Sequence, residues 1–244
     1  MKENIAGGQE LKCPSWNTSK RLKKGSSIPW AVSIHTVTAF IYAGLPGRGF
    51  WLTAIMAPRF LASAFASGPA LLILFCLVLK RVGRFDAGEK AIRTLAQIVA
   101  YALATSIFFV LVELFTVFYS QIPEHMQHYR FLFSGLDGYN TIANWMSVSA
   151  VCAVAALVLL VNPRTRKQEP LLAVACIAVF LSLWIEKGLG LVVTGFIPSP
   201  LEKVIRYTPT GPEVAITIGV WALGCLLITA LYKIFLAVKQ AEKP

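Results

Sequence analysis

Residues 95–119 read LAQIVAYALATSIFFVLVELFTVFY, an apolar run in which Glu113 is the one charged residue. At about 1.5 Å of rise per residue, a helix over this run is longer than the roughly 30 Å hydrocarbon core of a bilayer. Because backbone groups in lipid must satisfy their own hydrogen bonds, the run predicts a membrane-spanning α-helix. The chain is therefore predicted to be an integral membrane protein.

Comparable apolar runs flank this one on both sides. Together they are residues 28–45, 60–79, 95–119, 139–161, 171–193 and 214–238. Of the 244 residues, 56% are hydrophobic and only 14% are charged, which excludes a disordered chain and an ordinary soluble enzyme. We expect an all-α integral membrane protein with about six transmembrane helices in a bundle, the run at 28–45 being the weakest of them.

The positive charge of the chain follows the loops between these runs. The loops at 1–27, 80–94 and 162–170 and the tail from Lys233 hold 17 of the 23 Lys and Arg residues, whereas the opposite loops hold 5. This asymmetry predicts that both termini are cytoplasmic in a multi-pass protein of the cell inner membrane. It divides the chain into a basic cytoplasmic tail (1–27), a transmembrane domain (28–238) and a short cytoplasmic tail (239–244). The net charge of +11 then needs no nucleic-acid partner.

Residues that hold redox metals are sparse. The five cysteines stand far apart, at positions 13, 76, 152, 176 and 225, which argues against an iron–sulfur cluster. His35 is the one histidine at membrane depth, so the pair of axial ligands for a bis-histidine haem is missing. His125 and His128 form an H-x-x-H pair in an outer loop, where a solvated face is favoured over a metal site. We expect no metal, haem or cluster in this chain.

Ionisable residues within apolar helices are functional candidates, because burying them in hydrocarbon is costly. Five of them fall in the outer half of the predicted bundle or near its midplane: His35, Arg59, Glu113, Glu186 and Lys187. This shared depth is the strongest functional indication that the spacing gives.

Each of these residues also has a structural explanation. Arg59 is equally well placed to extend to outer lipid headgroups. A Lys187–Glu113 ion pair would fix only the packing of helices, and His35 would hydrogen-bond a neighbouring backbone. Glu186 and Lys187 are adjacent and are expected to point about 100° apart, so that each needs a partner on another helix.

Glu213 follows Gly211 and Pro212 at the start of the last run. A carboxylate there suits the exposed N–H groups of a helix N-terminus. Capping is favoured over proton transfer for this residue.

The membrane-depth groups suit the oxidation of a quinol, which needs an apolar slot, a hydrogen-bond partner for each oxygen and carboxylates that lead protons to water. A histidine is a suitable partner because its pKa lies near neutrality. Aromatic residues at Trp30, Phe40, Tyr42 and Trp51 would line such a slot, although aromatic residues are also common at membrane interfaces.

Two blocks of sequence are more specific. The first consists of SIHTVT from Ser33, LPGRGFW from Leu45 and APRFLASAFASG from Ala57. The second consists of WIEK from Trp184, GFIPSP from Gly195, YTPTGPE from Tyr207 and GVWALG from Gly219. In combination and order, over about residues 28–238, they resemble the NrfD/polysulfide-reductase membrane-subunit family, and most closely its DsrP-type subunit of sulfite-reduction-associated electron-transfer complexes.

The resemblance implies a membrane subunit of a respiratory complex, in anaerobic respiration linked to sulfur metabolism. It would bind menaquinone or another diffusible quinone and exchange electrons with a ferredoxin-like iron–sulfur subunit. It places His35, Trp51 and Arg59 at the quinone. Proton transfer or buried ion pairs would fall to the remaining ionisable residues, namely Glu113, Glu186, Lys187 and Glu213.

Two other functions remain open. The buried charges would also suit a proton or ion translocator without redox chemistry, and the chain would also suit a purely anchoring subunit. The family has more membrane helices than are counted here, and its motifs begin at about residue 28. We therefore expect the N-terminal helices of the family to be absent.

Overall fold

The computed structural model describes residues 32–82, 88–135, 138, 140–197 and 210–241. The described residues form helices joined by short loops, with no strand among them. Within the described part of the chain, five helical segments are long and apolar enough to cross a membrane: Met56–Arg81, Glu89–Ser120, Thr141–Val161, Glu169–Phe196 and Gly211–Ile234. The predicted all-α integral membrane fold is confirmed.

The predicted run at 28–45 is only partly described. Its described part is a shorter apolar helix, Val32–Ala43. The predicted tail at 1–27 and residues 242–244 lie outside the described residues.

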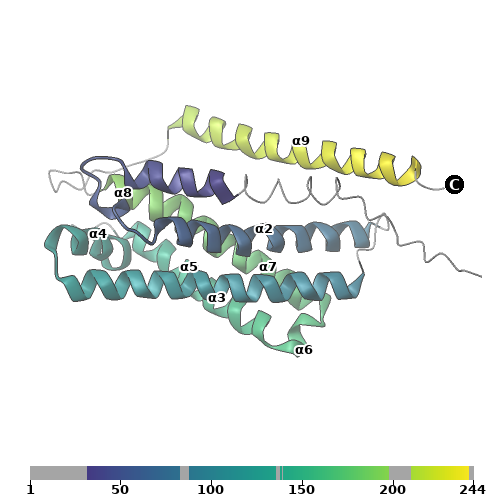
Figure 1. The fold of residues 1–244 in the computed structure, drawn as a ribbon, viewed down its shortest axis with the longest axis horizontal. Helices are drawn as coiled ribbons and strands as arrows, with labels where there is room; N and C mark the ends of the chain where they lie inside the picture. Colours follow the sequence, from purple (N-terminus) through teal and green to yellow (C-terminus); the bar gives the residue numbers. More distant parts are fainter. Residues whose placement is uncertain (1–31, 83–87, 136–137, 139, 198–209, 242–244) are drawn as a thin grey trace, which may run out of the picture. The chain divides into compact units, whose positions relative to one another are not determined.

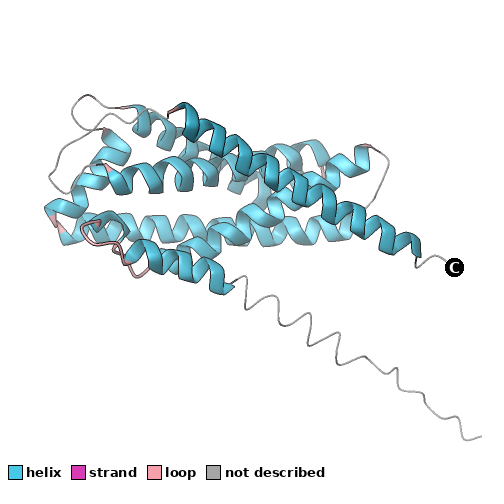
Figure 2. Ribbon diagram, turned by 90° about the horizontal axis from the view of Figure 1, so that it is seen from above, coloured by secondary structure: helices cyan, strands magenta, loops and turns pink. Residues whose placement is uncertain are grey.

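Four helices form the central bundle: α2 (Met56–Arg81), α3 (Glu89–Ser120), α5 (Thr141–Val161) and α7 (Glu169–Trp184). They run side by side in both views (Figures 1 and 2). Small buried residues, such as Ala66, Ala70 and Ala96, occupy the core between them and let the backbones approach closely. Large apolar side chains on the outside remain exposed, as a lipid-facing surface requires.

The chain divides into two compact units, residues 1–204 and 205–244. The second unit contains α9 (Gly211–Ala241), which is described by itself. Within it, the backbone N–H of Thr210 donates a 2.7 Å hydrogen bond to Glu213 Oε2. This is the capping interaction that the sequence favours for Glu213.

The helix that begins with α7 changes character part-way along. Ile185–Val193, labelled η2, is π-helical, and Thr194–Phe196 (α8) closes the segment. The apolar pattern predicted one regular helix over 171–193 and did not indicate this change. Because π-helical turns hydrogen-bond from i to i+5, they rotate the residues within them relative to an α-helix. Both Glu186 and Lys187 lie in this π segment.

A small cap covers the end of the bundle at which the π segment lies. It consists of η1 (Gly49–Trp51), α4 (Pro123–Ser134) and α8, and α4 and α8 lie at the same end in Figure 1. The ring of Phe50 lies 5.3 Å from that of Tyr129, and both residues are buried. The helix α4 was not predicted, since its polar histidines were assigned to a solvated loop. The short α6 (Pro163–Arg166) lies at the opposite end.

Candidate functional site

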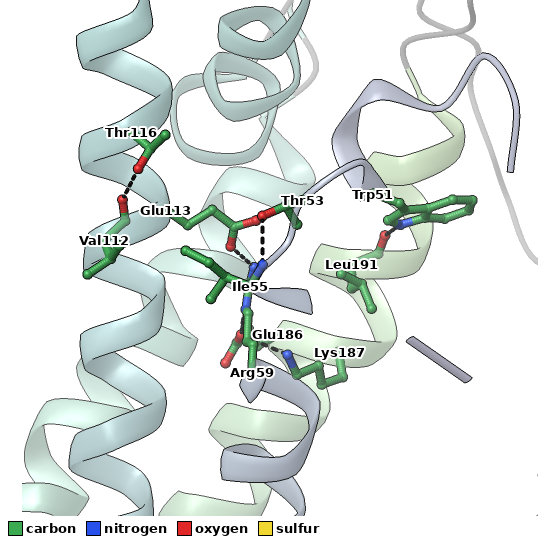
Figure 3. Close-up of polar contacts among 10 residues, drawn as sticks. All are labelled: Trp51, Thr53, Ile55, Arg59, Val112, Glu113, Thr116, Glu186, Lys187 and Leu191. Carbon is green, nitrogen blue, oxygen red and sulfur yellow. Dashed lines mark hydrogen bonds and ion pairs between the residues drawn. The ribbon is translucent and has the colours of Figure 1, made fainter. Parts of the chain in front are cut away.

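Arg59 lies in the first turn of α2 and is only 5% exposed. Its Nε and Nη2 donate hydrogen bonds of 3.2 and 2.7 Å to Glu186 Oε1 in the π segment. Its Nη1 donates to Glu113 Oε2 on α3. One planar guanidinium thus joins two buried carboxylates from two other helical segments (Figure 3).

This geometry decides between the explanations open for Arg59. Extension to outer headgroups is wrong, because the side chain points into the bundle and is enclosed there. Glu113 and Glu186 are themselves buried, and burying a carboxylate away from water is costly. The Arg59 guanidinium compensates their negative charges. The ion pairs formed by Arg59 therefore fix the relative positions of α2, α3 and the π segment.

Lys187 joins this group from the same segment as Glu186. Its Nζ lies 3.5 Å from Glu186 Oε1 and 5.0 Å from the centre of the Phe60 ring on α2. As expected, Glu186 has a partner on another helix, Arg59 of α2, and the ends of the two adjacent side chains also approach each other. The expected alternative pairing of Lys187 with Glu113 is not among the ion pairs of the described residues, where Glu113 pairs with Arg59.

A cavity of about 240 Å³ lies beside Lys187. His35 reaches it from the Val32–Ala43 helix. The other lining residues come from α2 and from the end of α7, and they are Phe60, Ser63, Ala64, Ser67, Phe180, Leu183 and Trp184. Lys187 Nζ is buried and has no hydrogen-bond partner among the described residues. The cavity is thus mainly apolar, with an imidazole and an ammonium group in its wall.

Trp51, which the resemblance places at the quinone, lies beside the π segment. It is fully buried, and its Nε1 donates a 2.9 Å hydrogen bond to the carbonyl oxygen of Leu191 in the π segment. Its ring packs edge-on to Tyr42 and Phe196, with centroids 4.9 and 5.1 Å away. Trp51 is not among the residues that line the cavity of His35 and Lys187. It holds the backbone of the segment that carries Lys187.

The predicted site residues are thus brought together in part. Arg59, Glu113, Glu186 and Lys187 form one buried charged group, the Arg59 cluster, and His35 shares a cavity with its lysine. Among the described residues, no three His, Cys, Asp or Glu side chains lie close enough to hold a metal ion.

Sequence reasoning missed two hydroxyl residues in the wall of the cavity, Ser63 and Ser67. They stand four positions apart and therefore on one face of α2. Their spacing within an apolar helix was the available signal. The carboxylate partners of Arg59 had no comparable signal, because they come from segments 54 and 127 residues away in sequence.

The residues of this site fall within a region that matches a known protein family. The model of the polysulphide reductase family, NrfD, matches residues 15–196, which include His35 and the whole Arg59 cluster. The chain belongs to the NrfD family. The match begins upstream of residue 28, where we expected the family motifs to begin, and it ends at the last residue of α8.

Two relatives of this NrfD-family chain are archaeal proteins. A putative membrane subunit of dimethyl sulfoxide reductase from Halobacterium salinarum is 26% identical over 227 residues, covering 84% of this chain and 50% of the relative. The Hdr-like menaquinol oxidoreductase integral membrane subunit of Archaeoglobus fulgidus is 25% identical over 234 residues, covering 90% and 58%. The chain thus spans about half the length of the curated relatives that it matches.

Proposed function

We propose that this NrfD-family chain is a quinone-interacting membrane subunit of a respiratory oxidoreductase complex, and that menaquinol is its quinone. It would pass electrons between the quinone pool of the cell inner membrane and a ferredoxin-like iron–sulfur subunit. Support comes from the family membership and from the name of one relative, a menaquinol oxidoreductase subunit.

The observation that carries the proposal is the buried Lys187 ammonium group beside the cavity. Its Nζ lies within ion-pair distance of Glu186 Oε1 but makes no hydrogen bond among the described residues, and a ligand oxygen in the cavity would give this donor a partner. His35 in the same wall offers a second polar partner, and the remaining walls are apolar and aromatic. This donor set fits a flat apolar ring that carries two oxygens.

A bound quinone would supply the two-electron, two-proton chemistry. The chain's own residues would orient it, with Lys187 Nζ donating to one oxygen and the His35 imidazole facing the other. Phe60 and Trp184 would exclude water from the ring. Trp51 and Arg59, which were also predicted at the quinone, support this site from behind by fixing the π segment and Glu186.

The test is equilibrium binding of a naphthoquinone analogue to the full chain in lipid nanodiscs. We expect His35→Ala and Lys187→Met each to weaken binding about 3- to 10-fold, the loss of one hydrogen bond. His125→Ala is the matched control, because His125 lies on α4 and does not line the cavity. Equal affinity of wild type and both cavity variants would contradict the proposal.

The Arg59 cluster favours a second candidate function, proton or ion translocation without redox chemistry. Four ionisable side chains in contact across three helical segments could act as a relay, and such groups in membrane helices commonly mark ion pathways. Proton flux into liposomes that contain the chain but neither quinone nor partner would support translocation. Flux that requires quinol oxidation would exclude it.

A further inference from the structure

A second cavity, of about 210 Å³, lies between α3, α5 and α7. Its walls are almost entirely apolar, and its polar side chains are Ser106, Ser149, Ser182 and Glu186. Both cavities are lined by α7 and the π segment, and Leu183 lines both. The second cavity is completed by α3 and α5, whereas the first is completed by α2 and the Val32–Ala43 helix. The function proposed above does not use this space.

Ser106 stands out among the polar residues of this cavity. It is 1% exposed, and its Oγ has no hydrogen-bond partner among the described residues. Serine and threonine hydroxyls in helices commonly bond a carbonyl one turn back. Two others on α3 do so, since Thr105 Oγ1 donates to Tyr101 O at 2.9 Å and Thr116 Oγ1 to Val112 O at 2.8 Å. The Ser106 hydroxyl therefore has a hydrogen bond to give within the cavity.

The other polar groups of the cavity are already engaged. Ser149 Oγ donates to Ser182 O at 2.8 Å, and Ser182 Oγ donates to Ser149 O at 2.9 Å. Glu186 Oε1 accepts two hydrogen bonds from Arg59, and an ionised carboxylate has no hydrogen bond to donate. A buried water needs two to four polar partners, and an apolar cavity of this kind stays dry.

The cavity borders the lipid-facing surface between α3 and α5. Leu111 on α3 and Val154 on α5 both line it, and each is 58% exposed. Ser106 lies deeper, near the middle of α3. A molecule dissolved in the bilayer would thus reach the hydroxyl between these two helices.

We propose that this cavity binds an uncharged, ring-sized apolar molecule that carries a carbonyl oxygen, with Ser106 Oγ donating a hydrogen bond to that oxygen. The size fits, because a dry engineered cavity of about 150 Å³ already binds benzene. The apolar walls disfavour a charged ligand, and the single available hydroxyl, that of Ser106, can donate a hydrogen bond to one ligand oxygen. This site is independent of the quinone proposed at His35 and Lys187.

The test compares two probes on the full chain in lipid nanodiscs. Menadione has carbonyl groups, and 2-methylnaphthalene has the same ring system without them. A photoreactive azide of menadione locates the site. We expect labels at Ala150 and Ala153 of α5 and at the residues of α3 that line the cavity. Labelling of the His35 cavity alone would overturn the proposal. A photoreactive phosphatidylcholine that labels these positions and is not displaced by menadione would assign the cavity to an acyl chain and also overturn it.

Variants then test the hydrogen bond and the space separately. The readout is labelling at this site by the menadione azide and its displacement by menadione or by 2-methylnaphthalene. Ser106→Ala should weaken menadione about 3- to 10-fold and leave 2-methylnaphthalene unchanged. The control for Ser106→Ala is Thr105→Val, because Thr105 is the neighbouring residue on α3 but is exposed. Ala153→Leu should remove binding of both probes by filling the cavity, whereas the exposed Ala155→Leu on the same helix should not. Unchanged labelling by the menadione azide in Ser106→Ala, or in Ala153→Leu, would contradict the proposal.

Discussion

The indole Nε1 of Trp51 donates a 2.9 Å hydrogen bond to the carbonyl oxygen of Leu191, 140 residues later in the chain. This bond joins the loop that follows the Val32–Ala43 helix to the π segment. Since the same segment carries Glu186 and Lys187, Trp51 positions both without contacting the cavity. In the proposed function, Trp51 thus supports the segment that carries Lys187.

The first prediction concerns this hydrogen bond. Trp51→Phe keeps an aromatic ring but leaves Leu191 O without its indole partner, so we expect a loss of about 1–2 kcal/mol in the free energy of unfolding. Thermal unfolding in detergent measures it. Trp145→Phe on the exposed face of α5 is the control and should have little effect. Equal stability of the two variants would mean that the Trp51 bond contributes nothing.

The second prediction uses the close contact between Trp51 and Gly195. A Cβ at Gly195 would overlap the indole ring, so Gly195→Ala must displace Trp51 and should destabilise the protein by about 1–3 kcal/mol. Gly188 has open space around its Cβ position, and Gly188→Ala should instead stabilise its helix by about 0.5–1 kcal/mol. The opposite signs of the two shifts in melting temperature are the result to look for. Two shifts of the same sign would refute this account of the contact.

The third prediction concerns the Arg59 cluster. Arg59→Gln leaves the buried Glu113 without its cation and Glu186 with Lys187 alone, and it should cost about 3–5 kcal/mol. The control is Arg93→Gln, which breaks an exposed pair with Glu89 one turn away and should cost less than about 0.5 kcal/mol. Adding Glu113→Gln to Arg59→Gln should recover part of the loss, because one unpaired charge is removed. A double variant that is no more stable than Arg59→Gln would argue against direct coupling.

The fourth prediction concerns pH. Burial in the cap lowers the pKa of His128 below its usual value, and the nearby His125 and Arg48 also disfavour its protonation, while backbone contacts at Thr194 and Ile197 oppose the shift. A lowered pKa in the folded state means that stability is complete above the ordinary histidine pKa of about 6.5 and falls as the pH decreases below it.

Melting temperatures at pH 7.5 and pH 5.5 measure this effect. The wild type should lose stability at the lower pH, and His128→Gln should lose less. His125→Gln, on the same helix, should retain most of the dependence because His128 remains. A wild-type protein that is equally stable at both pH values would contradict the prediction.

The sequence was sufficient to predict the membrane-spanning helices, because a long apolar run in lipid can satisfy its backbone hydrogen bonds in few ways other than a helix. It was also sufficient for the shared depth of Glu113 and Glu186. It did not reveal that Arg59 joins them, because that contact depends on how three distant segments pack. The π segment was not predictable either, since its apolar spacing fits an α-helix equally well, and Ser106 gained meaning only from its missing hydrogen bond.

The makeup of the Arg59 cluster has an electrostatic consequence for whatever binds beside it. Two cations, Arg59 and Lys187, face two carboxylates, Glu113 and Glu186, so in their ordinary charge states the four sum to zero. A neutral molecule can enter the adjoining cavity without altering that balance. An ionic metabolite would bring an uncompensated charge into a low-dielectric region, which disfavours its binding relative to a neutral molecule.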